Sequence, residues 1–305
     1  MKIGIIGLGS VGSAVATAIY NTGLVREMVF SDKDGVRAVA AAEDLSHATT
    51  FGFDIKINAT GGYSKLKDSD VVIISAGANQ KPTQKREDLL SANIGVMKDV
   101  VSKIMKNVNR NKVVLIVVTN PLDAMTTLVQ RLSGLPESRV IGTGTMLDSA
   151  RFRSELARNL QISPSSINAF ALGEHGDNAV LNWSSVSVGG VALEEFCKQT
   201  KNSLSSAVRK TIEYRVKNSA TEIIKGRGAT WDGIAAATAD LVRAIVNDEK
   251  RVLSVSTVQN GVAMSMLRIV CASGAIDTLI PKLSLIEVAA LRKAEQDIKN
   301  QIAKI

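Results

Sequence analysis

The sequence has few of the residues that mark several classes of protein. Its 305 residues include only two cysteines, Cys197 and Cys271, without metal-type spacing, which argues against a disulfide framework or a zinc site. Aromatic residues make up 4% of the chain and basic residues are scattered, so we expect no platform for stacking nucleic-acid bases. The apolar run at residues 113–118 is far too short to span a bilayer. Low-complexity runs and fixed-period repeats are also missing, which argues against disordered and solenoid proteins.

The composition that remains is typical of a globular protein. Hydrophobic residues make up 45% of the chain, enough to bury a large core, and the length suits two domains. The formal net charge of +8 indicates a solvated surface or, alternatively, an attraction for anionic substrates and cofactors. The opening residues 1–7 carry one charge and a glycine-broken apolar run, unlike a secretory signal. We therefore expect a soluble, cytoplasmic protein with neither a membrane nor a nucleic-acid partner.

A glycine-rich turn follows the first expected strand, residues 3–6. The turn reads Gly7-Leu8-Gly9-Ser10-Val11-Gly12, and a helical run follows from residue 13 to about residue 20. Glycines there permit a tight turn, close approach of a pyrophosphate, and packing of helix on strand. The start of the helix adds amide donors and a positive dipole end. This motif alone is weak evidence, and its place between a strand and a helix strengthens it.

A carboxylate ends the second expected strand, residues 28–31. Asp32 follows Gly12 by about 20 residues, where a carboxylate can accept the hydroxyls of an adenosine ribose. Its charge would repel a 2′-phosphate, so the sequence predicts NAD rather than NADP. The alternative is an ordinary turn or helix-cap residue, as the neighbouring Asp34-Gly35 suggests.

Apolar runs and helical segments then alternate as far as residue 142. The runs that we expect to be strands are residues 55–58, 71–75, 113–118 and 140–142, with helices at 35–49 and 87–109. This alternation predicts an α/β fold with a doubly wound parallel sheet, the Rossmann type, whose ligands bind beyond the carboxyl ends of the strands. We assign residues 1–143 to this NAD-binding domain and 144–305 to an α+β substrate domain.

Two of these strands lead into polar segments at the ligand-binding edge. Residues 76–86 begin with Ala76-Gly77 and would overhang the nicotinamide end of a dinucleotide. Further along, Pro121 restricts Asn120 to an extended conformation before the next helix. The alternative interpretation of Asn120 is a helix cap.

One of only two histidines lies in the segment Leu172-Gly173-Glu174-His175-Gly176-Asp177; the other is His47. A lone histidine can equally be a core residue whose ring nitrogens are satisfied by backbone groups. Upstream, Asp148 and Arg151 stand at i and i+3 of an expected helix and therefore share one face. A histidine, a carboxylate to orient it and a guanidinium to bind an anion are the parts of an acid–base site for a small carboxylate.

These motifs together resemble the family of NAD-dependent L-lactate and malate dehydrogenases, and within it the bacterial L-lactate dehydrogenases most closely. The resemblance covers nearly the whole chain. It rests on six segments that occur in family order and spacing: residues 7–12, 76–86, 119–121, 142–153, 172–177 and 228–230. The activity that it implies is reversible hydride transfer between NADH and pyruvate, giving L-lactate.

The resemblance also implies catalytic roles. His175 would exchange a proton with the substrate oxygen, and Asp148 would orient its ring. Arg151 would bind the substrate carboxylate with two hydrogen bonds. Arg86 would polarise the carbonyl group as its loop closes. Asn120 would donate a hydrogen bond near the reacting oxygen, and we expect the Asn120-Pro121 bond to be cis.

Further positions would surround the ligands. Thr230 would line the pocket beside the substrate side chain, and Ile234 would lie beside the nicotinamide. The residues that the resemblance places at the cofactor are Gly7, Gly9, Val11, Gly12, Asp32, Ala76, Gly77, Asn120 and Ile234. No metal is implied.

Gln80 bears on the choice of substrate. The matching family position is typically Gln for lactate and Arg for malate. A second substrate carboxylate buried against Gln80 would lack a counter-charge, at a cost of about 3–5 kcal/mol. The sequence therefore favours pyruvate over oxaloacetate.

The chain departs from the lactate pattern in two places. The first is the segment after His-Gly-Asp, where a Glu-Phe-Pro-like sequence is usual and this chain has Asn178-Ala179-Val180-Leu181-Asn182-Trp183. This difference favours a resemblance to L-2-hydroxyisocaproate dehydrogenases, which act on larger 2-oxo acids. Those enzymes, however, tend to have an active-site loop longer than residues 80–86 of this chain. Trp231-Asp232 after Thr230 is the other departure and affects the width of the pocket. Lactate remains the favoured substrate, and larger 2-hydroxy acids are the alternative.

Two features concern assembly and regulation. The resemblance implies a homodimer or homotetramer. Some bacterial relatives bind fructose 1,6-bisphosphate between subunits through an arginine and a histidine. Arg153 matches the arginine, whereas Asn168 occupies the histidine position. We therefore expect weak or absent activation by the bisphosphate.

The remaining sequence reads mainly as scaffold. Helices are expected at residues 203–225, 234–246 and 284–305, and a hairpin about Asn260-Gly261 joins strands at 252–258 and 262–270. Two functions of another class are the remaining alternatives. An NAD-dependent glycosidase would need a metal held by Cys and His, and neither cysteine has a histidine nearby. A non-catalytic NAD-binding protein would not need the polar groups that are present.

Overall fold

Six parallel strands make up the first part of the main sheet. The computed structural model describes residues 1–78 and 86–304. Its first strands lie in the order β3-β2-β1-β4-β5-β6, which is the doubly wound order, so the predicted fold class is confirmed. The strands are β1 (Lys2–Ile6), β2 (Glu27–Ser31), β3 (Lys56–Thr60), β4 (Val71–Ile74), β5 (Val114–Val117) and β6 (Val140–Gly142).

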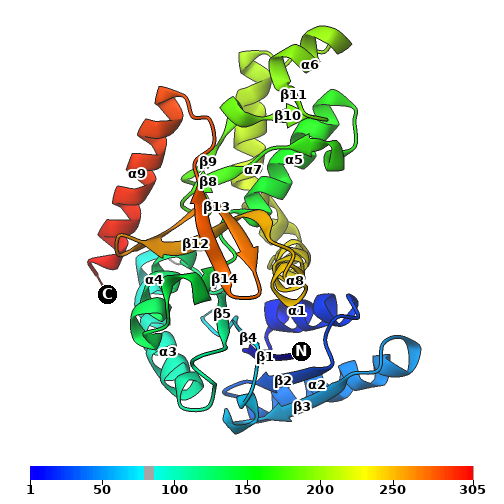
Figure 1. Cartoon of the computed structure of the whole chain (residues 1–305), viewed down its shortest axis with the longest axis vertical. Coiled ribbons are helices and arrows are strands. Elements are labelled where there is room, and N and C mark those ends of the chain that lie inside the picture. The colour runs from blue at the N-terminus through cyan, green and yellow to red at the C-terminus, as the bar shows by residue number, and fades with distance from the viewer. Residues whose placement is uncertain (79–85, 305) are drawn as a thin grey trace.

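Helices cover both faces of this sheet because its strands are apolar on both. In β1, Ile5 packs into a core with α1 (Ser10–Tyr20), α2 (Gly35–Ala48) and α8 (Asp232–Val246). The next residue, Ile6, points to the opposite face and packs into a core with α3 (Arg86–Met105), α4 (Leu122–Ser133) and α9 (Leu285–Ile302). α8 and α9 belong to the second half of the chain, so each core is built from both halves (Figure 1).

The sheet then continues into antiparallel strands. β12 (Arg251–Gln259) pairs with β6 through Ser256 and Gly142, and β13 (Val262–Cys271), β8 (Ala171–Gly173) and β9 (Ala179–Leu181) follow. β14 (Gly274–Leu279) also pairs with β13. The predicted β12–β13 hairpin is confirmed: Asn260 and Gly261 have φ of 53° and 81°, the positive values that its two-residue turn requires.

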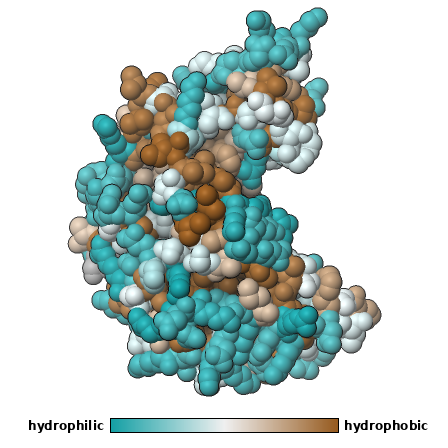
Figure 2. All heavy atoms as spheres, in the orientation of Figure 1, coloured by the Kyte–Doolittle hydropathy of each residue, from teal (hydrophilic) through white to brown (hydrophobic). Residues whose placement is uncertain are grey.

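The rest of the second half surrounds these strands. α5 (Met146–Leu160) packs against α7 (Ser206–Arg227), and α6 (Leu193–Thr200) lies at the far end of the molecule (Figure 1). A small separate sheet contains β7 (Ile167–Asn168), β10 (Ser187–Val188) and β11 (Val191–Ala192). In the space-filling view the molecule is hollowed on one side, between the α5–α6 end and the α2–β3 end (Figure 2). No helix in the described part of the chain has the length and apolar composition needed to cross a bilayer.

Candidate active site

The glycine turn between β1 and α1 is closed at two glycines and open at the third. A Cβ on Gly12 would lie 1.8 Å from the Gly7 carbonyl oxygen, and one on Gly7 would lie 2.6 Å from the Ala76 nitrogen. A Cβ on Gly9 would meet nothing within 4 Å. Gly9 precedes α1 and no side chain caps that helix, so its first amides remain for a ligand. The turn therefore fits the pyrophosphate of a dinucleotide, and Val11 lies half-buried in the first turn of the helix beneath it.

Asp32 is joined to this turn directly. It is 7% exposed, and its Oδ2 accepts a 2.6 Å hydrogen bond from the Leu8 amide, while Oδ1 accepts one from Asp34. The cap of α2 is Asp34, which accepts from the amides of Val36 and Arg37, so the cap alternative for Asp32 is wrong. The hydrogen bond from the Asp34 amide, two residues on, is the one expected of the turn alternative. Ionised carboxylate oxygens can each accept more than one hydrogen bond, which leaves capacity for ribose hydroxyls.

A buried asparagine that the sequence analysis missed joins the segments after β4 and β5. Asn93 of α3 is 1% exposed; its Oδ1 accepts from the Ala78 amide at 2.7 Å, and its Nδ2 donates to the Asn120 carbonyl at 2.6 Å. Gly77 is close to it, since a Cβ there would lie 3.2 Å from the Asn93 Oδ1. In the sequence, Asn93 is one polar residue of a long helix, and nothing in its surroundings distinguishes it.

The peptide bond that follows Asn120 is cis, as predicted. Pro121, not Asn120, is the N-cap of α4, so the cap alternative for Asn120 is wrong. Two other predictions fall outside the described part of the structure: Gln80, and the side chain of Arg86, the first residue of α3.

His175, Asp148 and Arg151 form one cluster. The His175 Nδ1 lies 2.7 Å from Asp148 Oδ2, and Arg151 donates to Asp148 Oδ1 at 3.0 Å. Asp148 is 1% exposed in the first turn of α5, whereas the side chain of His175 is 23% exposed. Asp148 thus holds one ring nitrogen and leaves Nε2 available to a substrate.

The charges of this cluster support each other. Burial of His175 disfavours the imidazolium, yet the Asp148 carboxylate outweighs it and raises the pKa of His175 above its usual value. Burial also opposes ionisation of Asp148, but His175 and Arg151 together lower the pKa of that carboxyl group. Each of the two groups therefore favours the charged form of the other.

A second carboxylate, also missed from the sequence, holds the backbone of the histidine. Asp123 of α4 is 3% exposed and accepts a 2.8 Å hydrogen bond from the His175 amide through Oδ2. Its Oδ1 accepts from the Ser256 hydroxyl at 2.6 Å. Burial raises the pKa of Asp123 to about 6. The only sequence signal was its place just after Asn120-Pro121.

Glu174, beside His175, connects the segment that carries the histidine to the C-terminal helix α9. Its two oxygens accept hydrogen bonds of 2.6 Å from Gln301 of α9 and from Asn178. Asn178 begins the segment that departs from the lactate pattern. Its amide therefore helps to fix the loop that carries the histidine.

Thr230 and Ile234 lie where α7 gives way to α8. Thr230 is half-buried, and Ile234 packs against the core cluster that contains Leu8 of the glycine turn. A Cβ on Gly233 would lie 2.9 Å from Leu147, the neighbour of Asp148, so the starts of α8 and α5 touch.

The two residues after Thr230 are held in place by the end of α7. The Arg227 guanidinium lies 4.1 Å from the Trp231 ring centroid, and its Nη1 lies 2.6 Å from Asp232 Oδ2. The second departure from the lactate pattern is therefore in contact with the end of α7.

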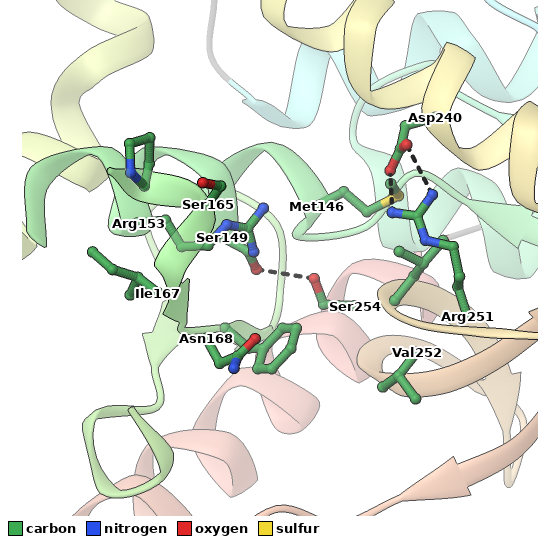
Figure 3. A pocket seen from close by; sticks show the side chains of 13 residues that line it. Met146, Ser149, Arg153, Ser165, Ile167, Asn168, Asp240, Arg251, Val252 and Ser254 are labelled. Atoms are coloured by element: carbon green, nitrogen blue, oxygen red, sulfur yellow. Dashed lines mark hydrogen bonds and ion pairs between the residues drawn. The ribbon is translucent and has the colours of Figure 1, made fainter. Parts of the chain in front are cut away.

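Arg153 and Asn168 line a different cavity, of about 270 Å³ (Figure 3). Arg153 donates to the Ala169 carbonyl at 3.2 Å. Arg251, in the same cavity, forms two hydrogen bonds of 2.9 Å with Asp240. The lining of the cavity therefore contains one carboxylate and two guanidinium groups.

Comparison with known proteins agrees with this geometry. Residues 1–142 match the NAD-binding domain of lactate/malate dehydrogenase, and residues 145–305 match the alpha/beta C-terminal domain of the same family. The L-lactate dehydrogenase of Thermus aquaticus is 45% identical over 98% of this chain and 97% of its own, and that of Allorhizobium ampelinum is 44% identical over 98% of each. The crystal structure of a minor L-lactate dehydrogenase from Enterococcus mundtii is 34% identical and superposes with a TM-score of 0.94 over 100% of this chain and 98% of that one. The chain belongs to the lactate/malate dehydrogenase family.

Proposed function

We propose that this protein is an NAD-dependent L-lactate dehydrogenase, which reduces pyruvate to L-lactate with NADH and a proton and catalyses the reverse reaction. The observation that carries the proposal is the His175–Asp148–Arg151 cluster, in a chain whose glycine turn fits a dinucleotide. The L-lactate dehydrogenases that are 44–45% identical over nearly the full length support it.

In this proposal each residue of the cluster has a separate task. The imidazolium of His175 gives its Nε2 proton to the carbonyl oxygen, and Asp148 keeps the ring oriented and favours the charged form. Arg151 uses one nitrogen on Asp148 and retains further donors for the substrate carboxylate. Bound NADH supplies the hydride for the carbonyl carbon. Arg86 polarises the carbonyl group, Asn120 hydrogen-bonds near the reacting oxygen, and Thr230 borders the substrate side chain.

The cofactor would lie along the carboxyl edge of the parallel strands. Gly7, Gly9, Val11 and Gly12 would face its pyrophosphate, and Asp32 its ribose. The other residues proposed to contact it are Ala76, Gly77, Asn120 and Ile234. We place the boundary between the NAD-binding domain and the substrate domain at residues 143/144.

The test is NADH oxidation with three 2-oxo acids at equal concentration. We expect pyruvate to give the highest kcat/KM. Oxaloacetate should be poorer by about two to three powers of ten, because Gln80 offers no counter-charge for a second carboxylate. Faster turnover of oxaloacetate would reject the Gln80 argument. Faster turnover of 4-methyl-2-oxopentanoate would identify the enzyme as a dehydrogenase of larger 2-hydroxy acids.

We further propose a cytoplasmic homodimer or homotetramer. Exposed apolar side chains on α2 support self-association: Val36 is 79% exposed and Val39 is 56% exposed. Sedimentation of the purified protein would measure the assembly, and a monomer would reject it.

Activation by fructose 1,6-bisphosphate should be weak or absent. Asn168 brings no charge to the cavity of Figure 3, and Arg251 is already paired with Asp240, so two phosphates would find little uncompensated positive charge. We expect the pyruvate concentration at half-maximal rate to change less than about twofold on adding the bisphosphate. A large drop would contradict this.

A further inference from the structure

The buried carboxylate of Asp123 is not accounted for by the roles proposed so far. It lies in the first turn of α4, in the first half of the chain, yet both of its partners belong to the second half. One is the backbone amide of His175, at 2.8 Å, and the other is the hydroxyl group of Ser256 in β12, at 2.6 Å. A buried carboxylate opposes folding unless it is needed or well paired. Asp123 has no cationic side chain among its hydrogen-bond partners in the described structure.

We propose that Asp123 is a positioning residue of the dehydrogenase reaction: it fixes the backbone of His175 and supplies a second negative charge that favours the imidazolium form of the ring. The proposal rests on the proposed function, because it concerns the proton that His175 would give to the substrate. The first negative charge is Asp148, which touches the ring itself. Asp123 contacts the backbone amide of His175 and not its ring.

The geometry gives Asp123 a reason to stand where it does. It follows directly after the turn that carries Asn120, so one short segment sets both Asn120 and the histidine backbone. The start of α4 also offers a positive dipole end that helps to keep the carboxylate ionised. Since burial raises its pKa only to about 6, Asp123 is charged at the higher pH at which His175 loses its proton.

Other charged groups lie around His175 on the elements packed against it. α5 contributes Asp148 and Arg151, and the loop between β8 and β9 contributes Glu174 and the exposed Asp177. Glu174 is bound by Gln301 and Asn178, and α9 adds Asp297, whose carboxylate lies 3.4 Å from Asn178. The contact from β12, Ser256, is neutral. Asp123 is therefore the second carboxylate in direct contact with the histidine residue.

The sequence offers a clean measurement because it contains only two histidines. NMR of protein labelled in the histidine rings gives one signal for His175 and one for His47, which is exposed on α2 and serves as an internal reference. We expect Asp123→Asn, which keeps the shape but removes the charge, to lower the titration midpoint of His175 by about one pH unit. The His47 signal should be the same in every variant. The alkaline limb of kcat/KM for pyruvate should move by the same amount.

Two further variants make the result decisive. Asp297→Asn removes a nearby charge that does not contact His175, and its midpoint should match the unaltered protein. Ser256→Ala weakens the ionised form of Asp123 and should shift the midpoint in the same direction by a smaller amount. If Asp123→Asn folds and the His175 midpoint is unchanged, the proposal is wrong. If it does not fold, an unchanged midpoint in Ser256→Ala overturns the proposal. A shifted midpoint in a protein that turns over no 2-oxo acid would reject the proposed function and leave the positioning role standing.

Discussion

The glycine turn and the His175 cluster are the two halves of the proposed site, and they are made in opposite ways. The turn occupies residues 7–12 and works because side chains are absent: Gly9 leaves open space and Gly12 touches the Gly7 carbonyl. The cluster works because charges are present, and the hydrogen bonds within it and those accepted by Asp123 join residues 27, 52 and 133 positions apart in the chain. The difference teaches that the first region can be recognised from one short segment, whereas the second exists only after the chain has folded.

The largest expected effect comes from removing the imidazole. His175→Ala should lower kcat for pyruvate reduction by roughly 10³-fold, because no other group in the cluster can supply the proton. NADH binding, measured by fluorescence titration, should be retained, since the glycine turn is untouched. Loss of both properties together would show that the two regions are not separable.

The next effect concerns the charge that orients the ring. Asp148→Asn should lower kcat/KM about 10²-fold and move its alkaline limb to lower pH. The direction of this shift follows from the reaction, because reduction consumes the imidazolium and the Asp148 carboxylate raises the pKa of His175. The rate should therefore fall as pH rises through that pKa, and in the variant it should fall at a lower pH. A pH profile from 5 to 10 measures it, and an unmoved limb would contradict the electrostatic role.

Two added methyl groups test the glycine turn. Gly9→Ala should weaken NADH binding about tenfold while leaving the unfolding free energy nearly unchanged, because its Cβ enters space left for the pyrophosphate. Gly12→Ala should weaken binding and also destabilise the fold by more than about 2 kcal/mol, since its Cβ would lie 1.8 Å from a carbonyl oxygen. Urea unfolding beside NADH titration separates the two. Equal stability of both variants would mean that the turn relaxes more than its packing suggests.

The smallest expected effect concerns cofactor choice. Asp32→Ser should raise the kcat/KM ratio of NADPH to NADH by roughly five- to tenfold, because it removes a charge that repels a 2′-phosphate. Asp32 also accepts from the Leu8 amide, so some loss with NADH is expected too. Steady-state rates with both cofactors measure the ratio, and no change in it would assign Asp32 to holding the turn alone.

What the sequence could predict follows the same division. The strands β1, β2 and β5 and the hairpin at Asn260-Gly261 were predicted because each carries its signal within a few residues. Strands of two or three residues are too short to show an alternating pattern, so the sequence did not predict β7, β8, β9, β10 and β11.

The site divides in this way too. His175, Asp148 and Arg151 were found because a histidine is rare here and the other two share a helix face. Asn93 and Asp123 were missed because their roles depend on partners that lie far along the chain. Gln80 and Arg86 stay predictions.

The pairing of β12 with β6 has a consequence for how the chain can be divided. Ser256 pairs with Gly142, and a Cβ on Gly142 would lie 3.1 Å from the Ser256 Cβ, so the end of the proposed first domain is pressed against a strand of the second. A fragment cut after residue 143 would leave the edge of β6 free to pair with other chains, and would bare the sheet face that α8 covers. Two domains can be named in this enzyme, but neither has its sheet edge and its core covered without the other.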